Sequence, residues 1–175
     1  MRVVAGELRG RRIVTPPGAT TRPTTDKVRE AIFNSLASMG MVEGAIVVDL
    51  YAGSGAMGIE ALSRGAARCT FVERDRDALL ALRENIAGLG IADRSCVVTS
   101  DVLAWVPGAR DIDLAIVDPP YEFTAWDRLL TTLDAADVVA ESDRAVVAPA
   151  GWEPVRVRRY GRTWVSLLTR ADAAE

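Results

Sequence analysis

Four short apolar runs in the middle half of the chain each end on or beside a carboxylate. In chain order, these carboxylates are Asp49, Glu73, Asp101 and Asp118. Asp118 also begins the tetrapeptide Asp-Pro-Pro-Tyr, in which neither Pro119 nor Pro120 has a backbone N–H that could extend a strand. Ligands of open α/β sheets bind outside the carboxyl ends of the strands, so these acids and Tyr121 are the first candidate site residues.

The composition limits the chemistry that such a site can perform. The 175 residues are 49% hydrophobic, which suffices for one domain with a full core. They include no histidine and two cysteines, which excludes Ser–His and Cys–His catalysis and histidine-ligated zinc, and we expect no metal. Cys69 and Cys96 are expected to be free thiols in a reducing compartment. Catalysis must therefore rest on carboxylates, backbone dipoles, aromatic rings or a reactive cofactor.

A glycine-rich stretch follows the first of these apolar runs. Gly53, Gly55 and Gly58 match the Gly-x-Gly-x-x-Gly pattern of dinucleotide sites, which by itself is weak evidence. Asp49 precedes the loop and would place negative charge where a diphosphate binds. A carboxylate there suits a cationic cofactor better, and S-adenosylmethionine carries both a sulfonium and an ammonium group.

The next two acids fit the nucleoside part of such a cofactor. Glu73 could accept hydrogen bonds from the ribose hydroxyls. Asp101 could accept one from the adenine amino group, and the backbone N–H of Val102 could donate to the ring. Each acid taken singly is more often a helix cap or a surface carboxylate, but their placement after successive strands favours a cofactor site.

The elements that must position these residues alternate along the chain. Strands are expected at 44–50, 68–73, 95–100 and 114–118, and helices at 56–65, 76–90 and 125–137. Three further strands are expected in succession at 144–151, 153–161 and 162–170, with a hairpin turn at 160–162. This order predicts an α/β, Rossmann-like sheet that is parallel with an antiparallel C-terminal edge and has helices on both faces.

Two further elements precede this alternation. Residues 1–17 resemble a β-hairpin, and residues 20–40 resemble a helix that begins near residues 24–26. Residues 1–30 carry seven Lys or Arg against three acids, a net charge of +4, whereas the remainder carries −7. Basic arms bind phosphate backbones, although solvated arginines on an exposed hairpin would explain the charge equally well.

At this point the sequence resembles the class I S-adenosylmethionine-dependent methyltransferases. Asp-Leu-Tyr-Ala-Gly-Ser-Gly at 49–55 resembles their cofactor loop, and Asp-Pro-Pro-Tyr resembles the motif of enzymes that methylate exocyclic amines of nucleobases. The cofactor-binding residues implied are Asp49, Tyr51, Ala52, Gly53, Gly55, Glu73, Arg74, Asp101 and Val102. The catalytic residues implied are Asp118, Pro119, Pro120 and Tyr121.

The chemistry of an exocyclic amine explains these residue types. Its nitrogen lone pair is delocalised into the ring, so the amine is a poor nucleophile. The Asp118 carboxylate and the Pro119 carbonyl could accept its two N–H bonds, and the prolines would preorganise those acceptors. Tyr121 would stack on the flipped base, which is worth about 1–3 kcal/mol. No strong general base is needed, because the proton becomes acidic once the nitrogen carries the methyl group.

Four segments narrow the resemblance to the bacterial 16S rRNA (guanine-N2)-methyltransferase family RsmD. They are RGRRIVTP, RPTTDKVREAIFNSL, DLYAGSGAMGIEALSRGA and VDPPY, and together they extend over most of the chain. The resemblance implies methylation of one guanine in the 16S rRNA of an assembled or assembling small ribosomal subunit. It implies RNA contacts by Arg9, Arg11, Arg12 and Arg22. It also implies that Arg22, Thr24 and Phe33 lie near the pockets for the cofactor and the target base.

The resemblance also sets expectations for organisation and for competing functions. We expect a recognition extension at 1–40, a methyltransferase domain at 41–175, a monomer and a cytoplasmic location without a membrane segment. An adenine-N6 DNA methyltransferase is the nearest alternative, because Asp-Pro-Pro-Tyr serves both amines, but the chain has little room for a DNA target-recognition segment. Asp49 and Asp-Pro-Pro-Tyr argue against a nicotinamide oxidoreductase. The complete set of acids and glycines argues against a non-catalytic nucleic-acid-binding protein.

Overall fold

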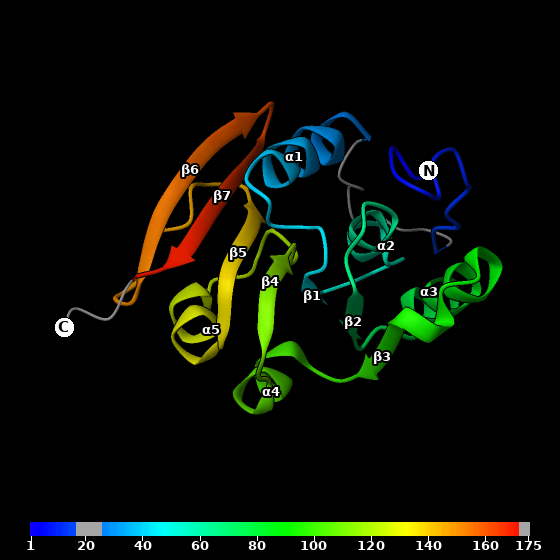
Figure 1. Ribbon diagram of the computed structural model, residues 1–175. Helices are drawn as coiled ribbons and strands as arrows, with labels where there is room; N and C mark the ends of the chain where they lie inside the picture. The colour runs from blue at the N-terminus through cyan, green and yellow to red at the C-terminus, as the bar shows by residue number, and fades with distance from the viewer. Residues whose placement is uncertain (17–25, 172–175) are drawn as a thin grey trace.

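The computed structural model describes residues 1–16 and 26–171 and contains one sheet of seven strands in the order β3-β2-β1-β4-β5-β7-β6 (Figure 1). The strands are β1 Ile46–Leu50, β2 Arg68–Glu73, β3 Ser95–Thr99, β4 Ile112–Val117, β5 Ala135–Ser142, β6 Trp152–Tyr160 and β7 Thr163–Arg170. The strands β1 to β5 pair in parallel, whereas β7 is antiparallel to both β5 and β6. The predicted Rossmann-like sheet with an antiparallel C-terminal edge is confirmed.

Helices cover both faces of this sheet and give the molecule three layers (Figure 1). The helices are α1 Asp26–Ser38, α2 Ala56–Ser63, α3 Arg76–Leu89, α4 Val102–Trp105 and α5 Trp126–Thr132, with 3-10 turns at Ala92–Arg94 and Val106–Gly108. One apolar core joins α1, α2 and α3 to the sheet, and the other joins α4 and α5 to the opposite face. Strand residues alternate between the two cores, as Val47 and Val48 do, because successive side chains point to opposite faces.

In the C-terminal half, the end of one predicted helix and one predicted strand are wrong. The helix expected at 125–137 ends at Thr132, and Ala135 already begins β5, which was not anticipated. The strand expected at 144–151 is a loop, in which the Val146 N–H donates to Ser166 Oγ at 3.1 Å. Residues 135–137 have low strand propensity, but pairing with β4, and of Asp137 with β7, overrides it.

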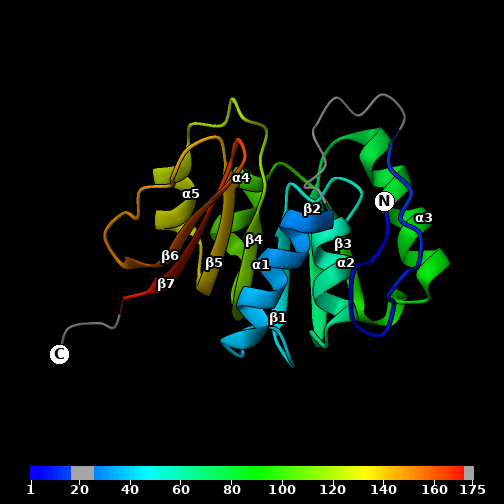
Figure 2. The same cartoon turned by 90° about the horizontal axis from the view of Figure 1, so that it is seen from above.

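Residues 1–16, the N-terminal segment, are less regular than the predicted hairpin but pack firmly against the rest of the protein. One antiparallel bridge joins Arg2 to Arg12, and the segment lies beside α2 and α3 (Figure 2). Val3 is 2% exposed and Ile13 is 1% exposed, and both belong to the same core as Phe33 of α1. The described part of the expected extension at 1–40 therefore shares its core with the rest of the chain, and its role in recognition stays a prediction.

Two smaller observations complete the fold. Cys69 is buried and Cys96 is exposed, and both are free thiols as predicted. Burial raises the pKa of the Cys69 thiol well above its usual value. Within residues 1–16 and 26–171, no helix combines the length and the apolar character that crossing a membrane requires.

Candidate active site

The parallel register brings the predicted site loops to one edge of the sheet. Leu50 at the end of β1 pairs with Val72 on one side and Val117 on the other. Beyond these pairs, the Ala52 N–H donates to the Val72 carbonyl at 3.1 Å, and the Asp118 N–H donates to the Leu50 carbonyl at 3.5 Å. The loops that follow β1, β2 and β4 therefore leave the sheet side by side.

Residues 51–55, the glycine loop, turn sharply between β1 and α2. Tyr51, Gly53 and Gly55 all have positive φ values, of 62°, 56° and 83°. A left-handed conformation is strained for a bulky residue such as Tyr51, and such strain is concentrated at functional sites. A Cβ added at Gly53 would meet no atom within 4 Å, whereas one at Gly58 would lie 2.4 Å from Phe71 Cε1. Gly53 thus exposes its backbone to open space, and Gly58 allows close packing of α2 on β2.

Asp49 is buried at the end of β1 and binds the backbone at the start of α2. It is 2% exposed, and its carboxylate accepts a hydrogen bond from the Gly58 N–H at 2.8 Å. Burial raises the pKa of Asp49 to about 8, the charge of Glu73 adds to the rise, and the Gly58 N–H opposes it. In the absence of a cation, the Asp49 carboxyl is therefore mostly protonated at neutral pH.

This raised pKa makes folding stability depend on pH. Between pH 4 and 8 the folded state holds a proton on Asp49 that the unfolded state releases, so the free energy of unfolding falls as pH rises. One proton corresponds to a slope of up to about 1.4 kcal/mol per pH unit. We expect Asp49→Asn to lack this slope, which urea unfolding of both proteins from pH 5 to pH 9 would measure. If the free energy of unfolding changes with pH in the same way in both proteins, the raised pKa of Asp49 is contradicted.

Glu73 is held rigidly at the end of β2. One of its carboxylate oxygens accepts from the Gly53 N–H at 2.8 Å, and the other accepts from the N–H groups of Arg74 and Asp75 at 2.7 and 2.8 Å. A carboxylate has about four lone-pair sites, so acceptor capacity is left for a ligand. Glu73 thus couples the end of β2 to the glycine loop beside the predicted ribose position.

Asp101 caps α4, as the simpler interpretation of that residue expects. Its carboxylate accepts from the Ala104 N–H at 3.3 Å and forms an ion pair with Arg74 at 2.9 Å. The side chains of Arg74 and Asp101 are 75% and 44% exposed. The side chain of Val102 is buried, so only its backbone could face a ligand. A helix-capping role does not prevent Asp101 from accepting a further hydrogen bond.

The predicted catalytic residues in the loop after β4 differ in their exposure to solvent. Asp118 is half-buried, Pro119 is buried, and Pro120 is exposed. Tyr121 is 43% exposed, which leaves its ring accessible for stacking on a ligand. The Phe123 N–H donates to the Pro120 carbonyl at 2.9 Å and closes a turn.

An aromatic cluster that the sequence analysis missed joins this loop to the glycine loop. The rings of Tyr51 and Phe123 pack edge to face with their centroids 5.5 Å apart. The rings of Phe123 and Trp126 pack in the same way with their centroids 5.1 Å apart. Burial raises the pKa of Tyr51 to about 12, so its hydroxyl is neutral at physiological pH. The spacing of aromatic residues after Tyr121 was the available signal for this cluster.

Asn85 is a second residue that the sequence analysis missed. This buried side chain of α3 exchanges two hydrogen bonds with the backbone of Val14, at 2.7 and 2.8 Å, and donates a third to the Ser54 carbonyl at 2.9 Å. It therefore links the N-terminal segment directly to the glycine loop. A polar residue on the apolar face of a helix, beside Leu82, Ile86 and Leu89, was the signal in the sequence.

The predicted RNA-binding arginines have different environments. Arg9 and Arg12 are exposed, and Arg11 donates to the Gly88 carbonyl at 2.7 Å. Arg11 and Arg12 border a surface hollow of about 240 Å³ beside α3. Arg22 and Thr24 lie outside the described residues. Phe33 is fully buried in the core, where the Arg64 guanidinium carbon lies 5.4 Å from its ring centroid. Its expected place near the cofactor and target pockets stays a prediction.

Comparison with known proteins places this chain in a family. The family model described as "Conserved hypothetical protein 95" matches residues 1–169. Ribosomal RNA small subunit methyltransferase D of Escherichia coli (strain K12) is 33% identical over 186 residues, which cover 100% of this chain and 92% of that protein. The candidate rRNA methyltransferase YlbH of Bacillus subtilis (strain 168) is 36% identical over 184 residues, which cover 97% of this chain and 99% of that protein.

Solved structures agree with this placement. The candidate methyltransferase yhhF from Escherichia coli superposes with a TM-score of 0.85 at 33% identity over 97% of both chains. The candidate methylase HI0767 from Haemophilus influenzae superposes with a TM-score of 0.80 at 25% identity, over 98% of this chain and 99% of that chain. The chain therefore belongs to the RsmD family, whose family model is described as "Conserved hypothetical protein 95", as its sequence motifs predict.

Proposed function

We propose that this protein transfers a methyl group from S-adenosyl-L-methionine to the exocyclic N2 amine of a guanine in 16S rRNA. Methylation of ribosomal RNA is supported by the names of the relatives. The observation that carries the finer proposal is the junction of two loops. The loop that begins at Asp118 lies against the glycine loop through the Leu50 carbonyl and the Tyr51–Phe123 contact. An acceptor for an amine thus lies beside a loop suited to a methyl donor.

The residues at this edge fit the proposed cofactor. Gly53 borders open space, and the carboxylates of Glu73 and Asp101 lie at the two neighbouring strand ends. Burial raises the pKa of the Asp49 carboxyl, so a nearby positive charge that stabilises the carboxylate would be favourable. When bound, the cofactor would supply an electrophilic methyl group on its sulfonium. Glu73 would orient the ribose hydroxyls, and Asp101 and the Val102 N–H would hold the adenine.

The loop after β4 would prepare the amine. The Asp118 carboxylate would accept one amine N–H, and the Pro119 carbonyl would accept the other, which favours a pyramidal nitrogen whose lone pair points away from both acceptors. The buried Pro119 keeps the loop rigid, so these acceptors need no rearrangement during the reaction. The exposed ring of Tyr121 would stack on the target base. Asp118 would stabilise the positive charge on the nitrogen until its proton leaves to solvent.

The substrate and setting are parts of the same proposal. Guanine N2 is preferred over adenine N6 because the family is that of ribosomal RNA small subunit methyltransferase D. A small ribosomal subunit as the substrate would place the enzyme in the cytoplasm. The described residues suggest a monomer, since their large exposed apolar side chains are scattered over several elements.

Methyl transfer to nucleic acids tests this proposal directly. Labelled S-adenosyl-L-methionine would be supplied with small subunits that lack the modification, with naked 16S rRNA, or with DNA. The products would be digested and identified by nucleoside mass spectrometry. N2-methylguanosine in subunit RNA is expected. N6-methyladenine in DNA would retain the chemistry of Asp118 but replace the substrate, and no transfer to any of the three would contradict the proposal.

The N-terminal arginines should contribute to RNA affinity. We expect Arg9→Gln, Arg11→Gln and Arg12→Gln together to weaken RNA binding and to reduce its salt slope by about two to three units, because each phosphate contact contributes about 0.7–0.9. Binding would be measured at several salt concentrations. Arg68→Gln, Arg110→Gln and Arg128→Gln, also exposed in the native protein, form the matched control. If the two triple variants bind RNA with equal affinity, the N-terminal arginines are solvated surface residues that do not contact RNA.

A further inference from the structure

We propose that the turn of the β6–β7 hairpin is a second RNA-contacting surface, which binds backbone phosphates on the other side of the active site from the N-terminal segment. This inference rests on the proposed function and extends it to the C-terminal end of the chain. It concerns Arg158, Arg159 and Arg162.

Charge is distributed unevenly along the chain in a way that singles out this hairpin. Residues 31–151 carry nine arginines against eighteen acids, a net charge of −9. Residues 152–170 carry five arginines against one acid, a net charge of +4, which equals the charge of residues 1–30. Two basic segments thus flank an acidic body. Electrostatic attraction to a polyanion would act through these two segments.

The strand register places the hairpin turn at the active-site edge of the sheet. Val117, the last residue of β4, pairs with Ala140 of β5, and Ala140 pairs with Ser166 of β7. Because β7 is antiparallel to β5, its first residues lie beyond this level, where Tyr160 pairs with Thr163. The turn therefore extends past the strand ends on the same side as the loop that begins at Asp118.

The distance from this turn to the target position suits a single RNA strand. In the sheet order, β7 is two strands from β4 and β6 is three. At about 4.8 Å per strand, the turn lies roughly 10–15 Å to the side of the loop after β4. The N-terminal segment lies on the opposite side, next to α3 (Figure 2). RNA whose target base enters between these flanks would meet arginines on both sides.

The three arginines at this end of the hairpin, two at the end of β6 and Arg162 in the turn, are available to an incoming anion. Arg158, Arg159 and Arg162 are all exposed. Among residues 1–16 and 26–171, no acidic side chain forms an ion pair with any of the three. Arg159 is preorganised, because its guanidinium lies 5.7 Å from the Trp164 ring and donates to the Gly161 carbonyl at 2.9 Å. Arginine is also the side chain best matched to phosphate geometry.

A protective role for these arginines is the competing explanation. β6 is an edge strand, and charged side chains on an edge strand prevent pairing with other chains. That role would be served by charge along the whole strand, whereas Arg162 lies in the turn beyond the ladder. The two explanations therefore differ in what loss of Arg162 does to RNA binding and to self-association.

Binding to 16S rRNA and to small subunits would be measured for Arg158→Gln, Arg159→Gln and Arg162→Gln combined, and for Arg162→Glu alone. The control is the Arg68, Arg110 and Arg128 triple variant. We expect the hairpin triple variant to bind RNA about ten- to fiftyfold more weakly near 0.15 M salt, with a salt slope lower by about two units. The cofactor affinity and the thermal unfolding midpoint should stay at the control values. Replacement of the same arginines by lysine should retain most of the binding.

Affinity within twofold of the control at every salt concentration would overturn the inference. Self-association of the variant with unchanged RNA affinity would also overturn it, and would assign the arginines to edge protection. Since binding is measured without turnover, a wild-type protein that binds RNA through the hairpin but methylates none of it would count against the proposed function alone.

Discussion

Replacement of Asp118 by alanine is expected to abolish methyl transfer, with a loss of at least a hundredfold, and to leave cofactor affinity within a few fold. A preorganised group that stabilises charge in the transition state is typically worth a factor of about 10²–10³ in rate. Asp118 follows β4, whereas the residues assigned to the cofactor follow β1, β2 and β3. Loss of its carboxylate therefore removes the acceptor for the amine and leaves the cofactor residues in place.

The backbone of this loop should survive the substitution. The Asp118 N–H still donates to the Leu50 carbonyl, and the turn closed by the Phe123 N–H and the Pro120 carbonyl does not involve the Asp118 side chain. Asp118→Asn keeps one oxygen acceptor and loses the negative charge, so we expect activity between those of the wild type and the alanine variant. This ordering separates the contribution of the charge from that of the hydrogen bond.

Two measurements decide the role of Asp118. Calorimetric titration with S-adenosyl-L-methionine reports cofactor affinity, and single-turnover transfer to small subunits reports the chemical step. Glu122→Ala is the matched control, because Glu122 is an exposed carboxylate in the same loop. An alanine variant that still methylates at half the normal rate would exclude the proposed role. A variant that loses cofactor binding in parallel with activity would move Asp118 to the cofactor site.

Local sequence patterns predict most of the parallel part of this fold for a physical reason. Runs such as Ile46–Leu50 are bounded by turn residues and are apolar enough to be buried on both faces, so their identity as strands does not depend on distant contacts. In β5, by contrast, residues 135–137 at the start of the strand have low local strand propensity. Their pairing with β4 and β7 extends the strand to them, and no short window of sequence contains that information.

The site shows the same division between local and non-local information. Strand-end acids could be located from sequence, because the end of an apolar run marks the carboxyl edge of a parallel sheet. The direction of each side chain could not. Asp49 points into the protein toward the Gly58 N–H, and Asn85 joins two loops that are distant in sequence. These contacts depend on how α2 and α3 pack against the sheet.

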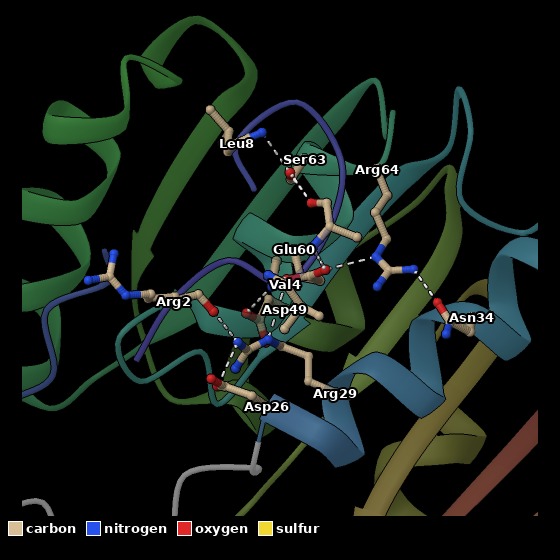
Figure 3. A network of polar contacts seen from close by, with 12 residues as sticks. Arg2, Val4, Leu8, Asp26, Arg29, Asn34, Asp49, Glu60, Ser63 and Arg64 are labelled. Carbon is tan, nitrogen blue, oxygen red and sulfur yellow. Dashed lines mark hydrogen bonds and ion pairs between the residues drawn. The ribbon is translucent and has the colours of Figure 1, made fainter. Parts of the chain in front are cut away.

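The largest effect on stability is expected from Glu60→Ala. Glu60 and Arg29 have no exposed surface, and Arg29 Nε lies 3.4 Å from a Glu60 carboxylate oxygen (Figure 3). The same carboxylate accepts from the Val4 and Ala5 N–H groups at 2.8 and 3.0 Å and from Arg64 Nε at 2.8 Å. Removal of one partner from a buried ion pair typically destabilises a protein by about 3–5 kcal/mol, because the other charge stays buried.

This loss should have a spatial signature as well as a magnitude. Arg29 also donates to the Arg2 carbonyl, so the N-terminal segment is bound to Glu60 and Arg29 through both its N–H and its C=O groups. We expect the amides of Val4 and Ala5 to lose protection from hydrogen exchange in Glu60→Ala before the sheet does. Urea unfolding would measure the total, and exposed Glu30 on α1 provides a control, Glu30→Ala, that should change stability by less than about 0.5 kcal/mol.

A double substitution distinguishes the cost of a buried Arg29 charge that loses Glu60 and keeps its Asp26 partner, 3.0 Å away, from a simple loss of packing. If the buried Arg29 charge causes most of the destabilisation, Glu60→Leu combined with Arg29→Met should be more stable than Glu60→Leu alone, because both charges leave the core together. If the double variant is less stable than either single variant, packing and the N–H acceptors dominate. In either case, the RNA affinity of the double variant, measured where it is folded, would show whether this anchoring of residues 1–14 is needed to present Arg9, Arg11 and Arg12 to a substrate.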